Sequence, residues 1–308
     1  TGAALDALGA ATKVVYPQAG YHTEDVAQPG SLARRNVEVL ALADAFPDRL
    51  NTCRGELKKL NVQIPDEHCF AGFDAYTKLL AIPEINYVIL ATPPHFRPLH
   101  LRAAVEAGKH AFIEKPAAVD GPGVRSVIES GELARQKGLG IVAGTQRRHL
   151  GSYAETIKRL QDGAIGDVLY GCAYWNGGVI WVIERQPAWS DMEWQLRNWY
   201  YFTWLSGDHI VEQHVHNLDI MNWALNDHPV RAHGMGGRQA RPSKSYGHIY
   251  DHFAVEYEYA NGTRVFSQCK QMDGCDNRVG ELLVGAKGSS NCQNLIQEGW
   301  RNSIHPKE

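Results

Sequence analysis

The sequence predicts an α/β protein in two parts: a parallel sheet with helices, followed by an α/β domain with a large, mostly antiparallel open sheet. Its length of 308 residues is enough for two domains of about 100–200 residues each. Short apolar runs alternate with helical patterns in the first half, and this alternation indicates a parallel sheet with helices on both faces. In the second half most strand patterns follow one another without intervening helices.

The strand patterns of the first half lie at residues 37–43, 87–91, 110–113 and 139–143. The helical patterns between them lie at residues 47–60, 74–80, 98–107 and 123–137. After about residue 144 the rhythm changes, and the remaining elements are expected at residues 168–175 (strand), 208–225 (helix), 230–234, 252–259, 264–270 and 281–284 (strands). Asn261-Gly262 lies between two of these strands and predicts a hairpin. We therefore expect domains at residues 1–147 and 148–308.

Composition excludes several classes of function. The chain has 31 Lys and Arg against 34 Asp and Glu, a net charge of −3, so its charge gives no reason to expect binding to nucleic acid or to an anionic membrane surface. No apolar run approaches the roughly 18–20 residues of a membrane helix. The six cysteines form no C-x-x-C pair, and we expect free thiols and no cysteine metal site.

The chain starts at Thr1 in what reads as a helix already under way. No pattern of basic, apolar and small-residue zones marks a signal peptide. We expect a segment to precede Thr1, so both a cytoplasmic and a periplasmic location stay open.

Polar residues follow three of the predicted parallel strands. Asp44 follows the strand at 37–43, and Glu114-Lys115-Pro116 follows the strand at 110–113. The strand at 87–91 leads into Thr92, Pro93, Pro94 and His95. Ligands of such folds bind at the carboxyl ends of the strands, and Pro116 restricts Lys115 to an extended backbone. Taken singly, Asp44 also reads as a helix N-cap, and Thr92-Pro93 as an ordinary turn.

These residues, with Ala107-Gly108-Lys109-His110 and residues 207–219, resemble the Gfo/Idh/MocA family of NAD(P)-dependent oxidoreductases over nearly the whole chain. The resemblance implies a Rossmann domain that binds NAD, and a second domain whose open sheet forms a homo-oligomer interface. It implies a cofactor site made of Asp44, Thr92, Pro93, Pro94, His95, Glu114, Lys115 and Gln146. The family's G-x-G-x-x-G phosphate loop is absent from this sequence. We expect that loop and its strand to precede Thr1, and the second domain to continue beyond residue 308.

Family members carry an Asp and, four residues later, a His beside the nicotinamide; Glu212 and His216 hold these positions here. A spacing of four places both on one face of a helix. By this reading His216 removes the proton of a substrate hydroxyl, Glu212 orients His216, and Lys115 stabilises charge on the oxygen. His214 replaces a small residue usual in the family and is expected to line the pocket. A zinc site of His209, Glu212 and His216 is the less favoured alternative.

The substrate is predicted from the residues around this cluster. Arg147 and His149 follow Gln146, and they are candidates for contacts with substrate hydroxyls. Seven of the eight tryptophans fall between residues 175 and 223, and Trp199, Tyr200 and Tyr201 are the strongest pocket candidates among the aromatic residues. Aromatic faces pack on sugar rings, although they also bury loops and form interfaces.

The function predicted is NAD-dependent oxidation of a secondary hydroxyl of a sugar, glycoside or cyclic polyol, with no metal. Two alternatives stay open: an NAD-dependent glycoside hydrolase that oxidises its substrate transiently, and a non-catalytic sugar-binding relative.

Overall fold

The structure is a computed structural model that describes residues 37–299. The chain forms two compact units. Among the described residues, the first unit contains residues 37–143 apart from residues 93–95 and 118–120, and the second contains those two segments and residues 144–299.

The first unit has parallel strands in two sheets. The sheets are β1 (Leu42–Asp44) with β2 (Cys69–Ala71), and β3 (Tyr87–Leu90), β4 (His110–Ile113) and β5 (Ile141–Ala143) in the order β3-β4-β5. Its helices are α2 (Pro47–Lys59), α3 (Ala75–Leu80), α4 (Arg97–Glu106) and α5 (Gly121–Gln136). The predicted parallel sheet with helices is confirmed. Strand β2 was not predicted, because three residues are too few to show a strand pattern.

Local chemistry explains where these elements begin and end. Pro47 opens α2 at a position where its missing N–H costs nothing. Gly108 follows α4 with a φ of 73°, the left-handed conformation that ends many helices. Leu101 of α4 is buried with Val88 of β3 and Ile113 of β4 in one apolar cluster, which fixes the helix on the sheet.

The second unit is built on a seven-stranded sheet. Its strands are β6 (Val168–Gly177), β7 (Pro229–Gly237), β8 (His252–Tyr259), β9 (Arg264–Gln271), β10 (Arg278–Gly285), β11 (Gly288–Ser290) and β12 (Ile296–Glu298), in the order β12-β11-β10-β6-β9-β8-β7. Strands β6 and β9 are parallel, and every other neighbouring pair is antiparallel. The predicted large, mostly antiparallel sheet is confirmed, and β8 and β9 pair antiparallel on either side of the predicted Asn261-Gly262 turn.

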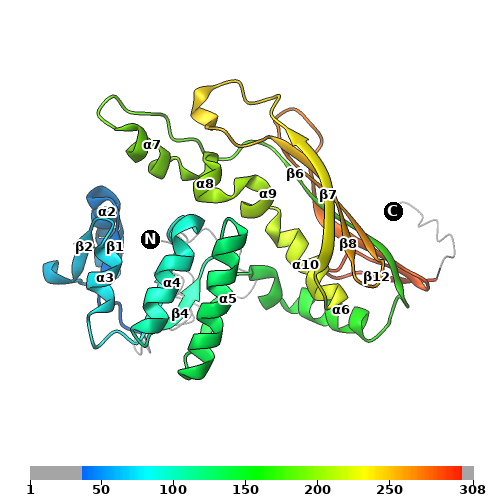
Figure 1. The fold of residues 1–308 in the computed structure, drawn as a ribbon, viewed down its shortest axis with the longest axis horizontal. Coiled ribbons are helices and arrows are strands. Elements are labelled where there is room, and N and C mark those ends of the chain that lie inside the picture. The colour runs from blue at the N-terminus through cyan, green and yellow to red at the C-terminus, as the bar shows by residue number, and fades with distance from the viewer. Residues whose placement is uncertain (1–36, 300–308) are drawn as a thin grey trace. The chain divides into compact units, whose positions relative to one another are not determined.

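Two helices, α6 (Gly151–Gln161) and α10 (Val215–Leu225), pack on one face of this sheet. The α-helices α7 (Asp191–Arg197), α8 (Thr203–Ser206) and α9 (Asp208–Glu212) lie between β6 and α10 in the sequence. Figure 1 shows α6 and α10 beside the sheet, and residues of both helices share an apolar core with Ala173, Val265 and Leu283 of the strands. On the opposite face Tyr170, Phe266 and Met235 are exposed. The α6 helix was not predicted.

The single helix predicted at residues 208–225 is wrong. Two helices, α9 and α10, are separated by a turn at Gln213 and His214. The backbone N–H of His214 donates to His209 O, five residues back, which is the wide pattern of a local π-type turn. The His214 side chain is buried and hydrogen-bonded to Ser267 of β9 at 2.7 Å. That buried polar contact favours the wide turn over a regular helix, because a buried imidazole needs a partner.

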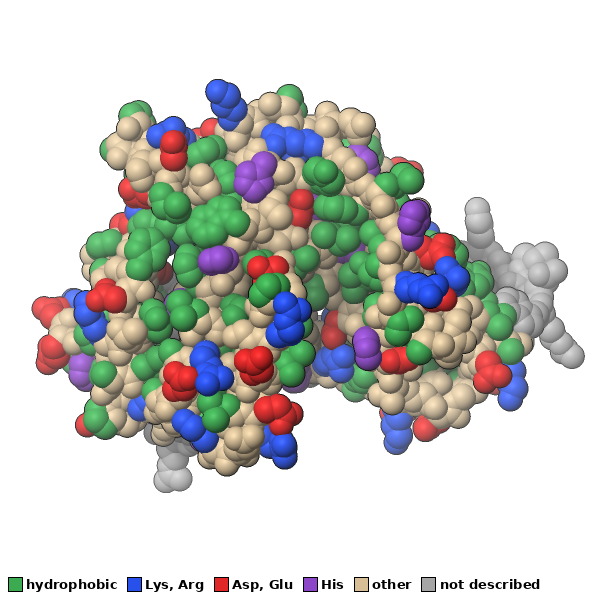
Figure 2. All heavy atoms as spheres, viewed as in Figure 1, with side chains coloured by type: hydrophobic (Ala, Val, Ile, Leu, Met, Phe, Trp, Pro, Cys, Tyr) green, Lys and Arg blue, Asp and Glu red, His purple; other side chains and the backbone are tan. Residues whose placement is uncertain are grey.

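Two further features are the hydropathy of the helices and the distribution of surface charge. Among residues 37–299 no helix is long and apolar enough to cross a membrane. Figure 2 shows acidic and basic side chains interspersed over the face that it presents, as the small net charge leads one to expect.

Candidate functional site

In the first unit, polar residues lie at the carboxyl ends of the parallel strands. Asp44 is the last residue of β1, Thr92 follows β3 by two residues, and Glu114-Lys115 directly follow β4. Asp44, Thr92, Glu114 and Lys115 are all half-buried. One carboxylate oxygen of Asp44 accepts a hydrogen bond from the backbone N–H of Phe46 at 2.9 Å. This contact leaves the other oxygen of the carboxylate for a ligand that donates hydrogen bonds.

One buried guanidinium fastens two of these strand ends together. Arg97 Nη2 donates to Thr92 O at 2.5 Å, and Arg97 Nη1 donates to Pro116 O. Thr92 Oγ1 is hydrogen-bonded to His100 Nδ1 at 3.2 Å. Burial, reinforced by the Arg97 charge, lowers the pKa of His100 to about 4. The structure therefore brings the segments around Thr92 and Lys115 side by side, with a neutral imidazole next to Thr92.

Residues 93–95 pack with the second unit. They enter a short 3-10 helix at Pro94–Phe96, and the His95 ring lies edge-on to Trp204 at 5.0 Å.

In the second unit, Glu212 and His216 lie on successive helices. Glu212 is the last residue of α9, and His216 is the second residue of α10. Both are buried. Glu212 Oε2 accepts a hydrogen bond from Gln213 Nε2 at 2.5 Å, and the His216 ring stacks on Trp175 with centroids 5.6 Å apart. The expected shared helical face does not form, because the turn at Gln213 and His214 intervenes.

The predicted pocket aromatics form a buried cluster. Tyr200 and Tyr201 are 1% and 0% exposed, whereas Trp199 is half-buried. Tyr201 Oη donates to Ile180 O at 3.2 Å, and Tyr200 Oη accepts from Gln271 Nε2 at 2.6 Å. Burial, together with the nearby negative charge of Glu212, raises the pKa of Tyr200 well above its usual value. The substrate contacts expected of Tyr200 and Tyr201 stay predictions, and Trp199 presents more ring surface than either.

The basic residues after β5 differ in exposure. Gln146 and His149 are exposed. Arg147 instead pairs with the buried carboxylate of Glu281, and its side chain is only 12% exposed. The Arg147 guanidinium also lies 5.8 Å from the centre of the Trp175 ring. Its bonding partners lie inside the second unit, which favours a structural role over direct contact with substrate.

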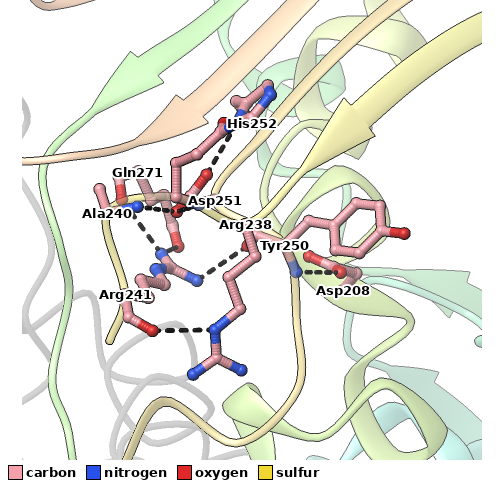
Figure 3. Close-up of polar contacts among 9 residues, drawn as sticks. Asp208, Arg238, Ala240, Arg241, Tyr250, Asp251, His252 and Gln271 are labelled. Atoms are coloured by element: carbon pink, nitrogen blue, oxygen red, sulfur yellow. Dashed lines mark hydrogen bonds and ion pairs between the residues drawn. The ribbon is translucent and has the colours of Figure 1, made fainter. Parts of the chain in front are cut away.

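A buried polar cluster that sequence reasoning missed supports α9 (Figure 3). Arg241 is 1% exposed; its guanidinium donates to Gln271 Oε1 at 2.5 Å and to Tyr250 O at 3.1 Å. The Asp208 carboxylate accepts from the backbone N–H of Tyr250 at 2.8 Å. Gln271 thereby links Arg241 to Tyr200, whose ring lies near Glu212. No signal in a single sequence marks such residues, because Arg and Gln are usually exposed.

The surroundings of this cluster shift the pKa values of two of its carboxyl groups in opposite directions. Burial raises the pKa of Asp208 to about 6, against two backbone hydrogen bonds that lower it. Asp251 accepts from the backbone N–H groups of Gln239 and Ala240 at 2.7 and 2.6 Å and contacts His252 Nδ1 at 2.7 Å. Although burial acts in the opposite direction, these hydrogen bonds lower the pKa of Asp251.

The alternative zinc site finds no support in the geometry. The His209 ring is fully buried against Phe253, 5.1 Å away, rather than grouped with Glu212 and His216. Among residues 37–299 no group of three or more His, Cys, Asp or Glu side chains is arranged to hold a metal ion.

Two family models match this chain in succession. Residues 19–145 match an oxidoreductase family with an NAD-binding Rossmann fold, and residues 153–290 match the Gfo/Idh/MocA C-terminal domain. The chain belongs to the Gfo/Idh/MocA family. Its first unit is thus the oxidoreductase family's Rossmann unit, and its seven-stranded sheet belongs to the family's C-terminal domain. The resemblance inferred from the sequence motifs is confirmed.

Individual relatives agree with this assignment. The chain is 27% identical to an inositol 2-dehydrogenase of Pseudomonas fluorescens over 75% of this chain and 59% of that protein. It is 27% identical to an uncharacterized oxidoreductase of Streptococcus pneumoniae over 69% of this chain and 53% of that protein. The chain therefore spans somewhat more than half the length of these two relatives.

A solved structure shares the fold. The WlbA dehydrogenase of Chromobacterium violaceum, in complex with NADH and UDP-GlcNAcA, superposes with a TM-score of 0.65. It is 18% identical, and the match covers 87% of this chain and 71% of that one. This likeness confirms the fold, a parallel Rossmann-type sheet followed by a large open sheet.

The strand ends of the first unit fit part of a dinucleotide. The half-buried Asp44 carboxylate has the acceptor chemistry that ribose hydroxyls require, and the half-buried Thr92 and Lys115 side chains supply hydrogen-bond donors. Pyrophosphate needs a cradle of glycine backbone N–H groups at a helix N-terminus, and the printed sequence contains no G-x-G-x-x-G. The residues present therefore fit the nucleoside and nicotinamide portions of NAD.

Proposed function

We propose that this protein is an NAD-dependent oxidoreductase that oxidises a secondary hydroxyl of a cyclic polyol or sugar. The observation that carries the proposal is the match of both halves of the chain to one oxidoreductase family. The half-buried Lys115 at the carboxyl end of β4 and the buried His216 in the first turn of α10 add the chemical groups that such a reaction needs.

NAD would be held by residues of the strand ends and would supply the acceptor for a hydride. Asp44 would accept hydrogen bonds from the adenosine ribose and disfavour a 2′-phosphate through charge repulsion. Thr92, Pro93, Pro94, His95, Glu114, Lys115 and Gln146 would contact the remainder of the cofactor. Arg97 would act indirectly, since it fixes the backbone on both sides of the site by bonding Thr92 O and Pro116 O.

The protein's own residues would manage the proton. We propose that the imidazole of His216 removes the hydroxyl proton, and that the Lys115 ammonium stabilises negative charge on a substrate oxygen. Glu212 would orient His216 or relay its proton. Tyr200 and Tyr201 would support this arrangement from within the core, and Trp199 and His149 would contact the ring and hydroxyls of the substrate.

The substrate class follows from the relatives and from the aromatic cluster. One relative is named an inositol 2-dehydrogenase, and inositol is a cyclic polyol whose ring carries only secondary hydroxyls. The half-buried indole of Trp199 offers a flat apolar surface of the kind on which such a ring packs. We propose a cyclic polyol or a sugar in the ring form.

The test measures turnover by the full chain. Purified protein is incubated with NAD and a panel of cyclic polyols, sugars and glycosides, and NADH is followed by its absorbance while free sugar is measured in parallel. We expect NADH to accumulate and Lys115→Met to abolish it without loss of folding. Lys78→Met is the matched control, because Lys78 is an exposed lysine on α3 that pairs with Asp74.

Each other result contradicts the proposal in a distinct way. Release of free sugar without NADH would make the protein a hydrolase, and NAD binding without turnover of any compound would make it a non-catalytic relative. Unchanged NADH production by Lys115→Met would remove the lysine from the mechanism.

We also propose that identical subunits associate through the outer face of the seven-stranded sheet. Tyr170, Phe266 and Met235 are exposed there, and Tyr170 and Phe266 pack edge-on at 6.5 Å. A mass measurement by light scattering should give an oligomer for the wild type and a smaller species for Phe266→Asp. A wild-type monomer would exclude this interface.

A further inference from the structure

The start of α10 is attached to three neighbouring strands of the sheet. His214, just before the helix, is hydrogen-bonded through Nε2 to Ser267 Oγ of β9 at 2.7 Å. Asn217 Nδ2 donates to Glu281 Oε1 of β10. Between these two residues in the sequence, the His216 ring stacks on Trp175 of β6 at 5.6 Å, with 28° between the ring planes. Residues 214, 216 and 217 thus each contact a different strand.

The strand register explains why the three contacts converge. Strand β6 lies between β10 and β9 in the sheet. Ala173 of β6 pairs with Glu281 on one side and with Ser267 on the other, so the three residues form one row across the sheet. Trp175 lies two residues further along β6 and therefore points to the same face. We call Trp175, Ser267 and Glu281 the His216 cradle.

Glu281 fixes the cradle to the rest of the unit. Its side chain is 1% exposed, and besides Asn217 it accepts hydrogen bonds from Arg147 and from Tyr153 Oη. The Arg147 guanidinium lies 5.7 Å from the Tyr153 ring and 5.8 Å from the Trp175 ring. One carboxylate therefore joins the chain after β5, the α6 helix and the start of α10, and its cationic partner also contacts the indole that stacks on His216.

We propose that the cradle positions His216 for proton transfer. An imidazole on a helix can rotate about its last side-chain bond, and stacking against a flat indole restricts that rotation. The bonds of His214 and Asn217 fix the backbone on both sides of His216, which is needed because the irregular turn before α10 lacks regular helical hydrogen bonding. Proton transfer is sensitive to such alignment. The inference rests on the proposed function, in which His216 is the base.

The test compares Trp175→Leu with Trp175→Phe in the full chain. Leucine removes the stacking surface, whereas phenylalanine keeps an aromatic face. Tyr174→Leu is the matched control, because Tyr174 is the next residue on β6, points to the other face and packs on Arg278 at 3.7 Å. The steady-state constants for polyol oxidation are measured together with the ring-proton NMR shifts of His216, assigned by their loss in His216→Asn.

We expect Trp175→Leu to lower kcat by about 10- to 100-fold, as for misalignment of a reacting group by a fraction of an ångström to 1 Å, with little change in KM. Its His216 ring protons should move downfield, since the ring current of the indole is lost. Trp175→Phe should restore most of kcat, and Tyr174→Leu should resemble the wild type in both measurements. Circular dichroism of each variant reports folding.

Three outcomes would overturn the proposal. Unchanged His216 shifts in Trp175→Leu would mean that the stack does not exist in solution. Altered shifts with an unchanged kcat would mean that the stack does not position a reacting group. A wild-type protein that binds NAD but oxidises no substrate would exclude the proposed function and the positioning role together. The NMR shifts can be measured without turnover, so they would distinguish this outcome from the absence of the stack in solution.

Discussion

We predict that acid destabilises the second unit because a buried histidine, His209, must stay uncharged in the folded protein. His209 is fully buried in α9, and neither ring nitrogen has a hydrogen-bond partner among the described residues. Burial, with a smaller contribution from the positive charge of Arg241, lowers the pKa of His209 to about 3. The perturbation is His209→Phe, which keeps a ring of similar size next to Phe253 and removes the titrating group.

The magnitude follows from linkage between protonation and folding. The ordinary pKa of His209 is 6.5 and its folded value is about 3, so the unfolded chain takes up a proton below pH 6.5 while the folded protein does not. The stability that the neutral imidazole contributes is present above pH 6.5 and is lost as the pH falls toward 3. At pH 6.5 half of the unfolded imidazole is already protonated, so the loss between pH 6.5 and pH 4.5 is about 1.7 pKa units, or about 2 kcal/mol.

Tryptophan fluorescence is the appropriate assay. All eight tryptophans follow residue 144 in the sequence, so urea denaturation followed by their emission reports the second unit. Unfolding free energies are measured at pH 6.5 and pH 4.5 for the wild type, His209→Phe and a matched control, His228→Phe, whose imidazole is 81% exposed. His214, with a pKa lowered by burial to about 4, acts in the same direction in all three proteins.

The expected result is a loss on acidification that is smaller in His209→Phe than in the wild type by about 2 kcal/mol. The control should keep the wild-type loss. Equal losses in His209→Phe and the wild type would refute the reasoning, because they would show that the imidazole is protonated in the folded protein or reaches water.

Three further predictions concern stability. Glu281→Ala should cost about 3–5 kcal/mol in urea denaturation because it leaves a buried cation unpaired, and a loss of the size usual for an exposed ion pair would contradict that burial. Gly247→Ala should lower the free energy of unfolding by about 2 kcal/mol, because Gly247 has a φ of 53° and an added Cβ would overlap Tyr201 O. Gly131→Ala inside α5, where no atom lies near the added Cβ, should instead raise it by about 0.5–1 kcal/mol. Equal effects of the two substitutions would invalidate the steric argument. Arg97→Met should cost about 3 kcal/mol through two lost charged hydrogen bonds, measured by thermal circular dichroism, and an unchanged melting temperature would mean that the strand ends do not depend on Arg97.

Much of the fold could be predicted because its signals are local. The strand at residues 110–113 and the helix beginning at Pro47 are formed where apolar periodicity and proline place them. The prediction of one helix at residues 208–225 was wrong, and its cause cannot be seen in the local sequence. His214 bonds Ser267, 53 residues further along the chain, and that contact exists only once the sheet has formed.

The candidate site divides in the same manner. The motifs around Lys115 and His216 were found from the sequence because they resemble the motifs of the Gfo/Idh/MocA family. Glu281, Trp175 and Arg241 could not be assigned roles, because each acts through partners that lie far away in the sequence. Arg147 is an example: its place beside Gln146 makes it a candidate for substrate contacts, and only the structure shows that it pairs with Glu281, 134 residues away.

The sequence by itself determined the family, the two-part α/β architecture and the residue types available for hydride-transfer chemistry. These properties depend on periodicity and on residues adjacent in the chain. Only the tertiary structure decided which side chains are buried, where the predicted helix breaks and which residues hold His216. Burial and register depend on contacts between distant segments, and it is those contacts that turn Glu281 into a structural centre and give His209 and Asp208 their displaced pKa values.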